Sequence, residues 1–148
     1  MKATDNLVDF VRQKAEQSDK SIDWPARRRK WKKDVAGLYK TIRGWLSPLI
    51  ADGTIQIDES KVKLREDYIG TYEISRLHIL IGDQTVIFRP KGALVYGAEG
   101  RVDLTGTRSD NVLLVNDGQW SIVEGGDRVR FVPFTEESFR GLLEEVMA

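Results

Sequence analysis

The feature that most constrains the fold is a series of short β-rich segments over residues 68–123, separated by turns that contain glycine. Two of these turns are Gly82-Asp83 and Asp117-Gly118, and the second lies between residues 112–116 and 119–123. Such two-residue turns join neighbouring antiparallel strands, because glycine readily adopts the positive φ that a tight turn needs. Since parallel strands would need long crossovers, the pattern predicts an antiparallel meander.

The clearest helix in the sequence starts after Asp23, whose side chain can cap it. Its apolar residues recur at spacings of three, four or seven, which predicts one buried stripe. The stripe consists of Trp24, Trp31, Val35, Leu38, Ile42, Trp45 and Leu49. Pro48 lacks the backbone N–H that a helix interior requires, so we expect the helix to end or bend near Ser47.

The order of these elements predicts the fold class. We expect one α+β domain over residues 1–148, with helices over 1–50, a curled antiparallel meander of about six or seven strands over 54–132, and a C-terminal helix over 135–147. A strongly bent sheet closed by a C-terminal helix resembles the plan of pleckstrin-homology-type domains. The resemblance is architectural and covers roughly residues 54–148.

Composition excludes some kinds of site. The chain has no cysteine, so disulfides, zinc–thiolate centres and cysteine nucleophiles are ruled out. No apolar run approaches the roughly 18–20 residues that span a bilayer. We therefore expect a soluble cytoplasmic protein without a transmembrane segment, a metal or a cofactor.

The charge is distributed unevenly along the chain. Residues 24–46 contain eight basic side chains and one acid, Asp34, so this segment carries +7 and the remainder −7, because the total is zero. The basic residues are Arg27, Arg28, Arg29, Lys30, Lys32, Lys33, Lys40 and Arg43. An asymmetry of this kind indicates an acidic partner or pairing within the fold.

Several interpretations of this basic helix remain open. Its cations could be solvated and partly neutralised by acids of the C-terminal helix, namely Glu136, Glu137, Glu144 and Glu145. They could instead dock an acidic protein, or follow nucleic-acid phosphates without reading bases. The zero net charge disfavours nucleic acid, and the packing stripe disfavours membrane binding. An unprotected edge strand could also pair two copies into a homodimer.

The sequence gives little indication of catalysis. His78 is the single histidine and lies in an apolar segment, without the partners that a catalytic or metal-binding histidine needs. A small-ligand site or active site in a cleft of the bent sheet, near His78, Arg89, Arg101 and Asp103, is the alternative. The leading hypothesis is a non-enzymatic binding or accessory protein that uses its basic helix face.

Overall fold

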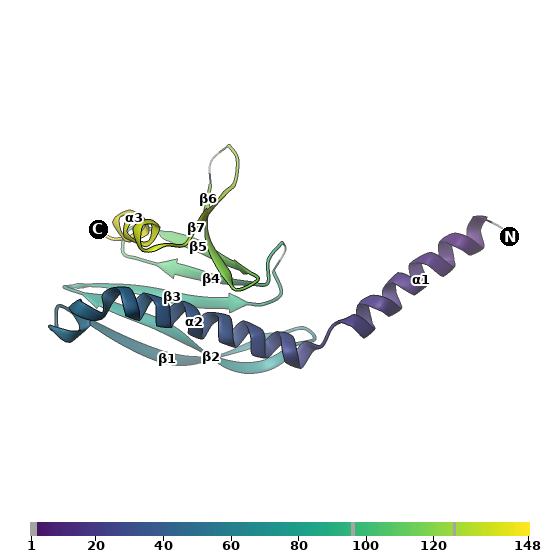
Figure 1. Ribbon diagram of the computed structural model, residues 1–148, viewed down its shortest axis with the longest axis horizontal. Helices are drawn as coiled ribbons and strands as arrows, with labels where there is room; N and C mark the ends of the chain where they lie inside the picture. The colour runs from purple at the N-terminus through teal and green to yellow at the C-terminus, as the bar shows by residue number, and fades with distance from the viewer. Residues whose placement is uncertain (1–2, 96, 126) are drawn as a thin grey trace.

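A computed structural model describes residues 3–95, 97–125 and 127–148. Two helices, α1 (Ala3–Ser21) and α2 (Trp24–Ala51), precede seven strands, and α3 (Glu136–Val146) follows them (Figure 1). The strands are β1 (Ile55–Glu66), β2 (Gly70–Ile81), β3 (Gln84–Gly92), β4 (Gly100–Thr105), β5 (Asp110–Asn116), β6 (Gln119–Glu124) and β7 (Arg130–Pro133). Each pairs antiparallel with its sequence neighbour, so the predicted α+β meander is confirmed.

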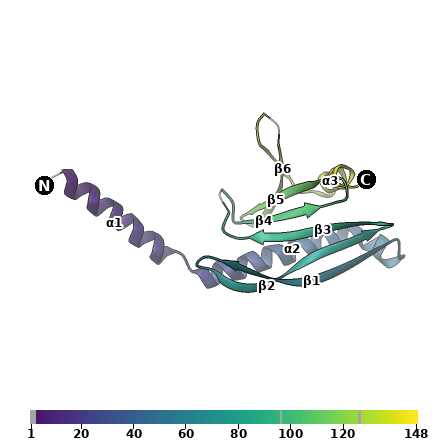
Figure 2. The same cartoon turned by 180° about the vertical axis from the view of Figure 1, so that it is seen from behind.

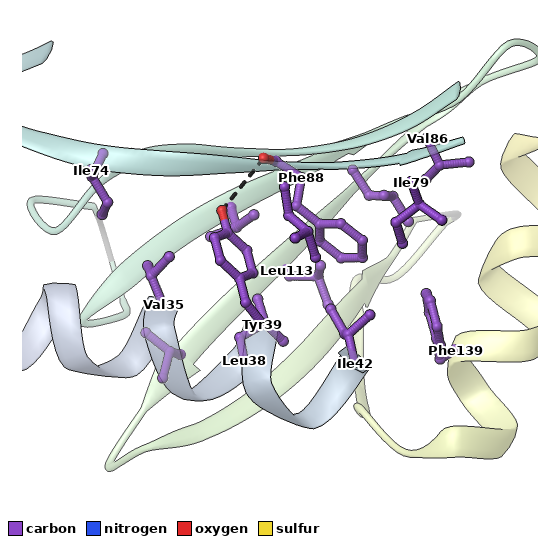
Figure 3. Packing of buried hydrophobic residues seen from close by; sticks show 14 of the residues in the cluster. Val35, Leu38, Tyr39, Ile42, Ile74, Ile79, Val86, Phe88, Leu113 and Phe139 are labelled. Carbon is purple, nitrogen blue, oxygen red and sulfur yellow. Dashed lines mark hydrogen bonds between the residues drawn. The ribbon is translucent and has the colours of Figure 1, made fainter. Parts of the chain in front are cut away.

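The sheet is open, with β1 and β7 as its two edges. α2 runs along it beside β1, β2 and β3, and α3 lies at the end formed by β5, β6 and β7 (Figures 1 and 2). The core lies between these helices and the sheet, where Tyr39 and Ile42 of α2 meet Phe88 of β3 and Phe139 of α3 (Figure 3). The Tyr39 hydroxyl donates to the Ser75 carbonyl at 2.6 Å, which satisfies a polar group beside this core.

The turn chemistry agrees with the sequence prediction. Asp117 and Gly118 both have positive φ, 50° and 73°, as the two central residues of a type I′ turn require. In the earlier hairpin, Gly82 has φ of 62°. Thr135 caps α3 by accepting from the Ser138 N–H at 3.1 Å, so that helix also begins as expected.

β1 is one continuous strand of 12 residues that runs through the acidic residues Asp58 and Glu59. It pairs with β2 over its whole length without a register shift. In β2, Tyr72 and Ile74 are buried near the start of the strand, and Leu77 and Ile79 are buried near its end. Because side chains alternate along a strand, these two pairs lie on opposite faces. Two-stranded ribbons twist strongly, so the ribbon turns first one face and then the other toward the core.

α2 continues one turn beyond its predicted end, through Pro48 to Ala51. Of the two expectations, an end or a bend near Ser47, the end is wrong, because proline removes only one N–H donor and Pro48 still accepts from the Asp52 N–H at 3.2 Å. Most of the predicted stripe is buried or half-buried, but Leu49 is 38% exposed and lies outside the core.

Candidate docking surface on the long helix

The arginines nearest the start of α2 bind the protein's own backbone. Arg27 Nη2 donates to the Ala93 carbonyl at 3.1 Å, and Arg28 Nη1 lies 3.4 Å from the Ile69 carbonyl. Arg27 Nε is buried without a hydrogen-bond partner. These side chains lie at the edges of the apolar stripe and fix the first turns of α2 to the loops at one end of the sheet. They are therefore parts of the scaffold and are poorly placed to meet a partner.

Two further cations of α2 form ion pairs within the protein. Lys30 Nζ lies 3.2 Å from Asp34 and 3.1 Å from Glu99, and Arg43 lies 3.7 Å from Glu59. Partial desolvation lowers the pKa of Lys30, but its hydrogen bonds to Glu99 and Asp34 outweigh this effect and raise the pKa above its usual value. Lys30 and Arg43 are thus partly neutralised by nearby carboxylates.

The remaining four cations are exposed and form no ion pair with any residue that the structure describes. We call Arg29, Lys32, Lys33 and Lys40 the cationic stripe. At 100° per residue, Arg29, Lys33 and Lys40 lie about 160–200° around α2 from Trp31, on the side away from the core, and Lys32 flanks them.

The C-terminal helix does not neutralise α2. Glu144 pairs with Arg140 of its own helix at 3.2 Å, and Glu145 lies 3.5 Å from the Asn111 amide. The internal partners of the basic helix are instead Asp34, Glu59 and Glu99. Pairing with the α3 glutamates, one interpretation of the sequence, is therefore wrong.

A buried hydrogen-bond chain holds α2 in place and was not found by sequence reasoning. Trp31 Nε1 donates to the Tyr72 hydroxyl at 2.9 Å, and that hydroxyl donates to Glu66. The other Glu66 oxygen accepts from the Ala93 and Leu94 N–H groups, both at 2.9 Å. Burial, followed by the hydrogen bond to Glu66, raises the pKa of Tyr72. Nothing in local spacing marks Glu66, because its partners are distant in sequence.

The four residues of the cleft alternative lie on the sheet face opposite α2. His78 Nε2 lies 2.8 Å from Ser60 Oγ, and Arg101 makes a bidentate pair with Asp103 at 2.7 and 3.1 Å. Arg89 is directly across from Asp103 on the neighbouring strand. Thus Arg89, Arg101 and Asp103 come together in a polar cluster, and His78 does not join it.

The interior of the bent sheet is filled by the protein's own side chains. Phe88, Val102 and Leu104 are fully buried on its inner face, beneath α2. The hollows along α2 and α3 are lined by other residues than the four of the cleft alternative. In the described part of the chain, His78, Arg89, Arg101 and Asp103 therefore share an outer surface and line none of these four hollows.

Comparison of the chain with protein-family models, with curated proteins and with solved structures finds no match. In the part of the chain that the structure describes, no helix is long and apolar enough to cross a membrane. No three of the described histidine, aspartate and glutamate side chains are grouped so that they could hold a metal ion.

Proposed function

We propose that this chain is a non-enzymatic binding protein that docks an acidic protein surface through its cationic stripe. The observation that carries the proposal is the division of the eight α2 cations. Arg27, Arg28, Lys30 and Arg43 are engaged within the fold, whereas the four cations of the stripe project outward without a carboxylate partner among the described residues.

The stripe is also held on a fixed support. Trp31 is 1% exposed and hydrogen-bonded to Tyr72, so the N-terminal third of α2 cannot rotate without breaking buried contacts. A preorganised surface loses less conformational freedom on binding than a mobile one. The remainder of the chain is net negative, so an acidic partner would be directed toward α2 and repelled elsewhere.

Charge reversal on the stripe tests the proposal. Lys33→Glu with Lys40→Glu changes two exposed side chains that have no described ion pair, so the fold should be retained. Arg28 is unsuitable for this purpose because it contacts the Ile69 carbonyl. The matched control is Lys63→Glu with Lys91→Glu, which makes the same change in net charge on exposed strand positions.

A photo-crosslinking residue at exposed Ala36, between Lys33 and Lys40, can capture the partner in an extract of the native host. We expect one acidic protein to be cross-linked by the parent chain and by the control, and to be lost from the stripe variant. With the purified partner, affinity should fall by about tenfold or more, since exposed ion pairs each contribute up to about 1 kcal/mol.

Equal capture by the stripe variant and the control would refute the proposal. So would binding to double-stranded DNA whose affinity falls steeply with salt and disappears in the stripe variant, because that result would indicate phosphate recognition by the same cations.

A further inference from the structure

α1 exposes an apolar face that no described residue of its own chain covers. Leu7, Phe10 and Val11 are 63%, 57% and 56% exposed, and Val8 is 44% exposed. α1 projects away from the sheet and from the other helices (Figure 1). Anchors at positions i, i+3 and i+4 are the pattern with which an amphipathic helix enters a groove. Isolated helices of this length are marginal in water, so a binding site would stabilise α1.

The protein also contains a groove of suitable character, between the last turns of α2 and the whole length of α3. It has a volume of about 1180 Å³. Its apolar walls are Trp45, Leu46 and Leu49 from α2, Phe139 and Leu143 from α3, and Met147 just after α3. Small-molecule pockets usually measure roughly 300–1,000 Å³, so this groove is large enough to receive the apolar side chains of a helix.

The charges around the groove complement those of α1. Its lining carries three glutamates, Glu136, Glu137 and Glu144, and two arginines, Arg108 and Arg140, so it is negative by one charge, and Glu144 pairs with Arg140. On α1, Lys14 lies within the apolar face, between Leu7 and Phe10, and Arg12 lies at its edge beyond Val8. Its acids at positions 9 and 16 lie about 180–200° around the helix from Leu7 and would point away from the groove.

α1 cannot reach this groove within its own chain. At about 1.5 Å per residue, Leu7 and Val11 lie about 18–24 Å from the junction at Asp23, whereas Trp45 and Leu49 lie about 33–39 Å from it. A helix folded back along α2 would therefore place its anchors more than one turn short. The groove can receive α1 only from another copy.

We propose that α1 of one copy docks in the α2–α3 groove of a second copy, and that the exchange is reciprocal. Two identical contacts then close a symmetric dimer. Half the surface of residues 3–16, taken as a cylinder about 21 Å long and 10 Å wide, is about 330 Å². Each contact also covers a similar area of the groove, and the dimer has two contacts. The dimer therefore buries on the order of 1,300 Å², within the roughly 1,200–2,000 Å² of specific interfaces.

Sedimentation velocity over a concentration series tests the dimer. The parent chain should dimerise, and Leu7→Ser with Phe10→Ser should shift the dissociation constant upward by at least about a hundredfold, because both contacts lose their anchors. The control, Asp9→Ser with Glu16→Ser, alters the opposite side of α1 and should still dimerise. On the groove side, Leu49→Glu should be monomeric, whereas Ser47→Glu, an exposed neighbour outside the groove lining, should not be.

A mixing experiment distinguishes this exchange from other modes of association. The Leu7→Ser/Phe10→Ser chain retains its groove, and the Leu49→Glu chain retains its α1. Together they should form a heterodimer with one restored contact. The chain has no cysteine of its own. Val8→Cys on the Leu49→Glu chain and Leu143→Cys on the Leu7→Ser/Phe10→Ser chain should therefore form a disulfide across that contact.

Three results would overturn the proposal. The first is a parent chain that stays monomeric at all concentrations. That result refutes the exchange even if α1 then binds a different protein or sediments with phosphatidylserine vesicles. The second is dimerisation that survives loss of the α1 anchors, which would point to pairing of edge strands. The third is failure of the two complementary variants to associate, with near-ultraviolet circular dichroism confirming that both are folded.

Discussion

Replacement of Gly100 by alanine should destabilise the protein through a single contact. Gly100 begins β4 and is buried against the indole ring of Trp31. A Cβ there would overlap indole atoms Cε3 and Cζ3 and would lie 3.1 Å from Cη2. Gly100 is not among the glycines with positive φ, so alanine is compatible with the backbone and the effect is purely steric.

The magnitude follows from how the ring is held. Carbon atoms in contact prefer separations of about 3.5–4.0 Å, so the indole must move by about 1 Å or more. Overpacking of this kind costs about 1–3 kcal/mol. The same movement breaks the 2.9 Å hydrogen bond from Trp31 to Tyr72, which adds about 1 kcal/mol. We therefore expect Gly100→Ala to lower the free energy of unfolding by about 2–4 kcal/mol.

Urea unfolding followed by circular dichroism measures this change, with the denaturant slope checked for constancy. In a Trp31→Leu background the overlapping ring atoms are absent, so Gly100→Ala should cost less than about 1 kcal/mol. Gly37→Ala is the matched control, since nothing lies within 4 Å of its added Cβ and alanine should favour the helix by about 0.5–1 kcal/mol. An equal cost of Gly100→Ala in both backgrounds would refute the reasoning.

Two further predictions concern a turn and the alkaline limit of stability. Gly118→Ala should cost about 1 kcal/mol in thermal unfolding, because Gly118 has φ of 73° in the turn after Asp117; an unchanged melting temperature would show that the turn relaxes at no cost. Burial raises the pKa of Tyr39, and burial with the Glu66 hydrogen bond raises that of Tyr72, so the folded state favours the neutral phenols. The stability they give is complete below about pH 10, where unfolded tyrosine begins to ionise, and is lost as the pH rises further. The urea midpoint should therefore fall above about pH 10, and a midpoint independent of pH there would contradict this assignment.

Local chemistry explains why much of the fold could be predicted. The Asp117-Gly118 turn fixes its hairpin by the φ values that its two residues tolerate. Thr135 starts α3 through bonds to Ser138, only three residues away. The spacing of the α2 stripe identified Trp31 and Ile42 as core residues. Each of these features depends on interactions between residues that are close in sequence or repeat with one period.

Features that depend on distant residues were not predictable. Helical spacing places Arg27 at the edge of the stripe, but it does not indicate that Arg27 binds the Ala93 carbonyl, 66 residues away. Glu66 joins Tyr72 and the backbone at Ala93 only because the twisted ribbon brings them together. The stability of such contacts is set by strand register and helix orientation, which no local segment specifies.

The sequence alone predicted the order of the elements, an antiparallel meander of about six or seven strands and the face of α2 that packs inward, because hydrophobic periodicity and turn conformations are local properties. Tertiary structure alone decided which cations of α2 are neutralised, whether an apolar groove lies beside Leu49, and whether the face of α1 finds a partner. These outcomes depend on the distances between side chains in the folded protein. Those distances are fixed only when the helices pack on the completed sheet.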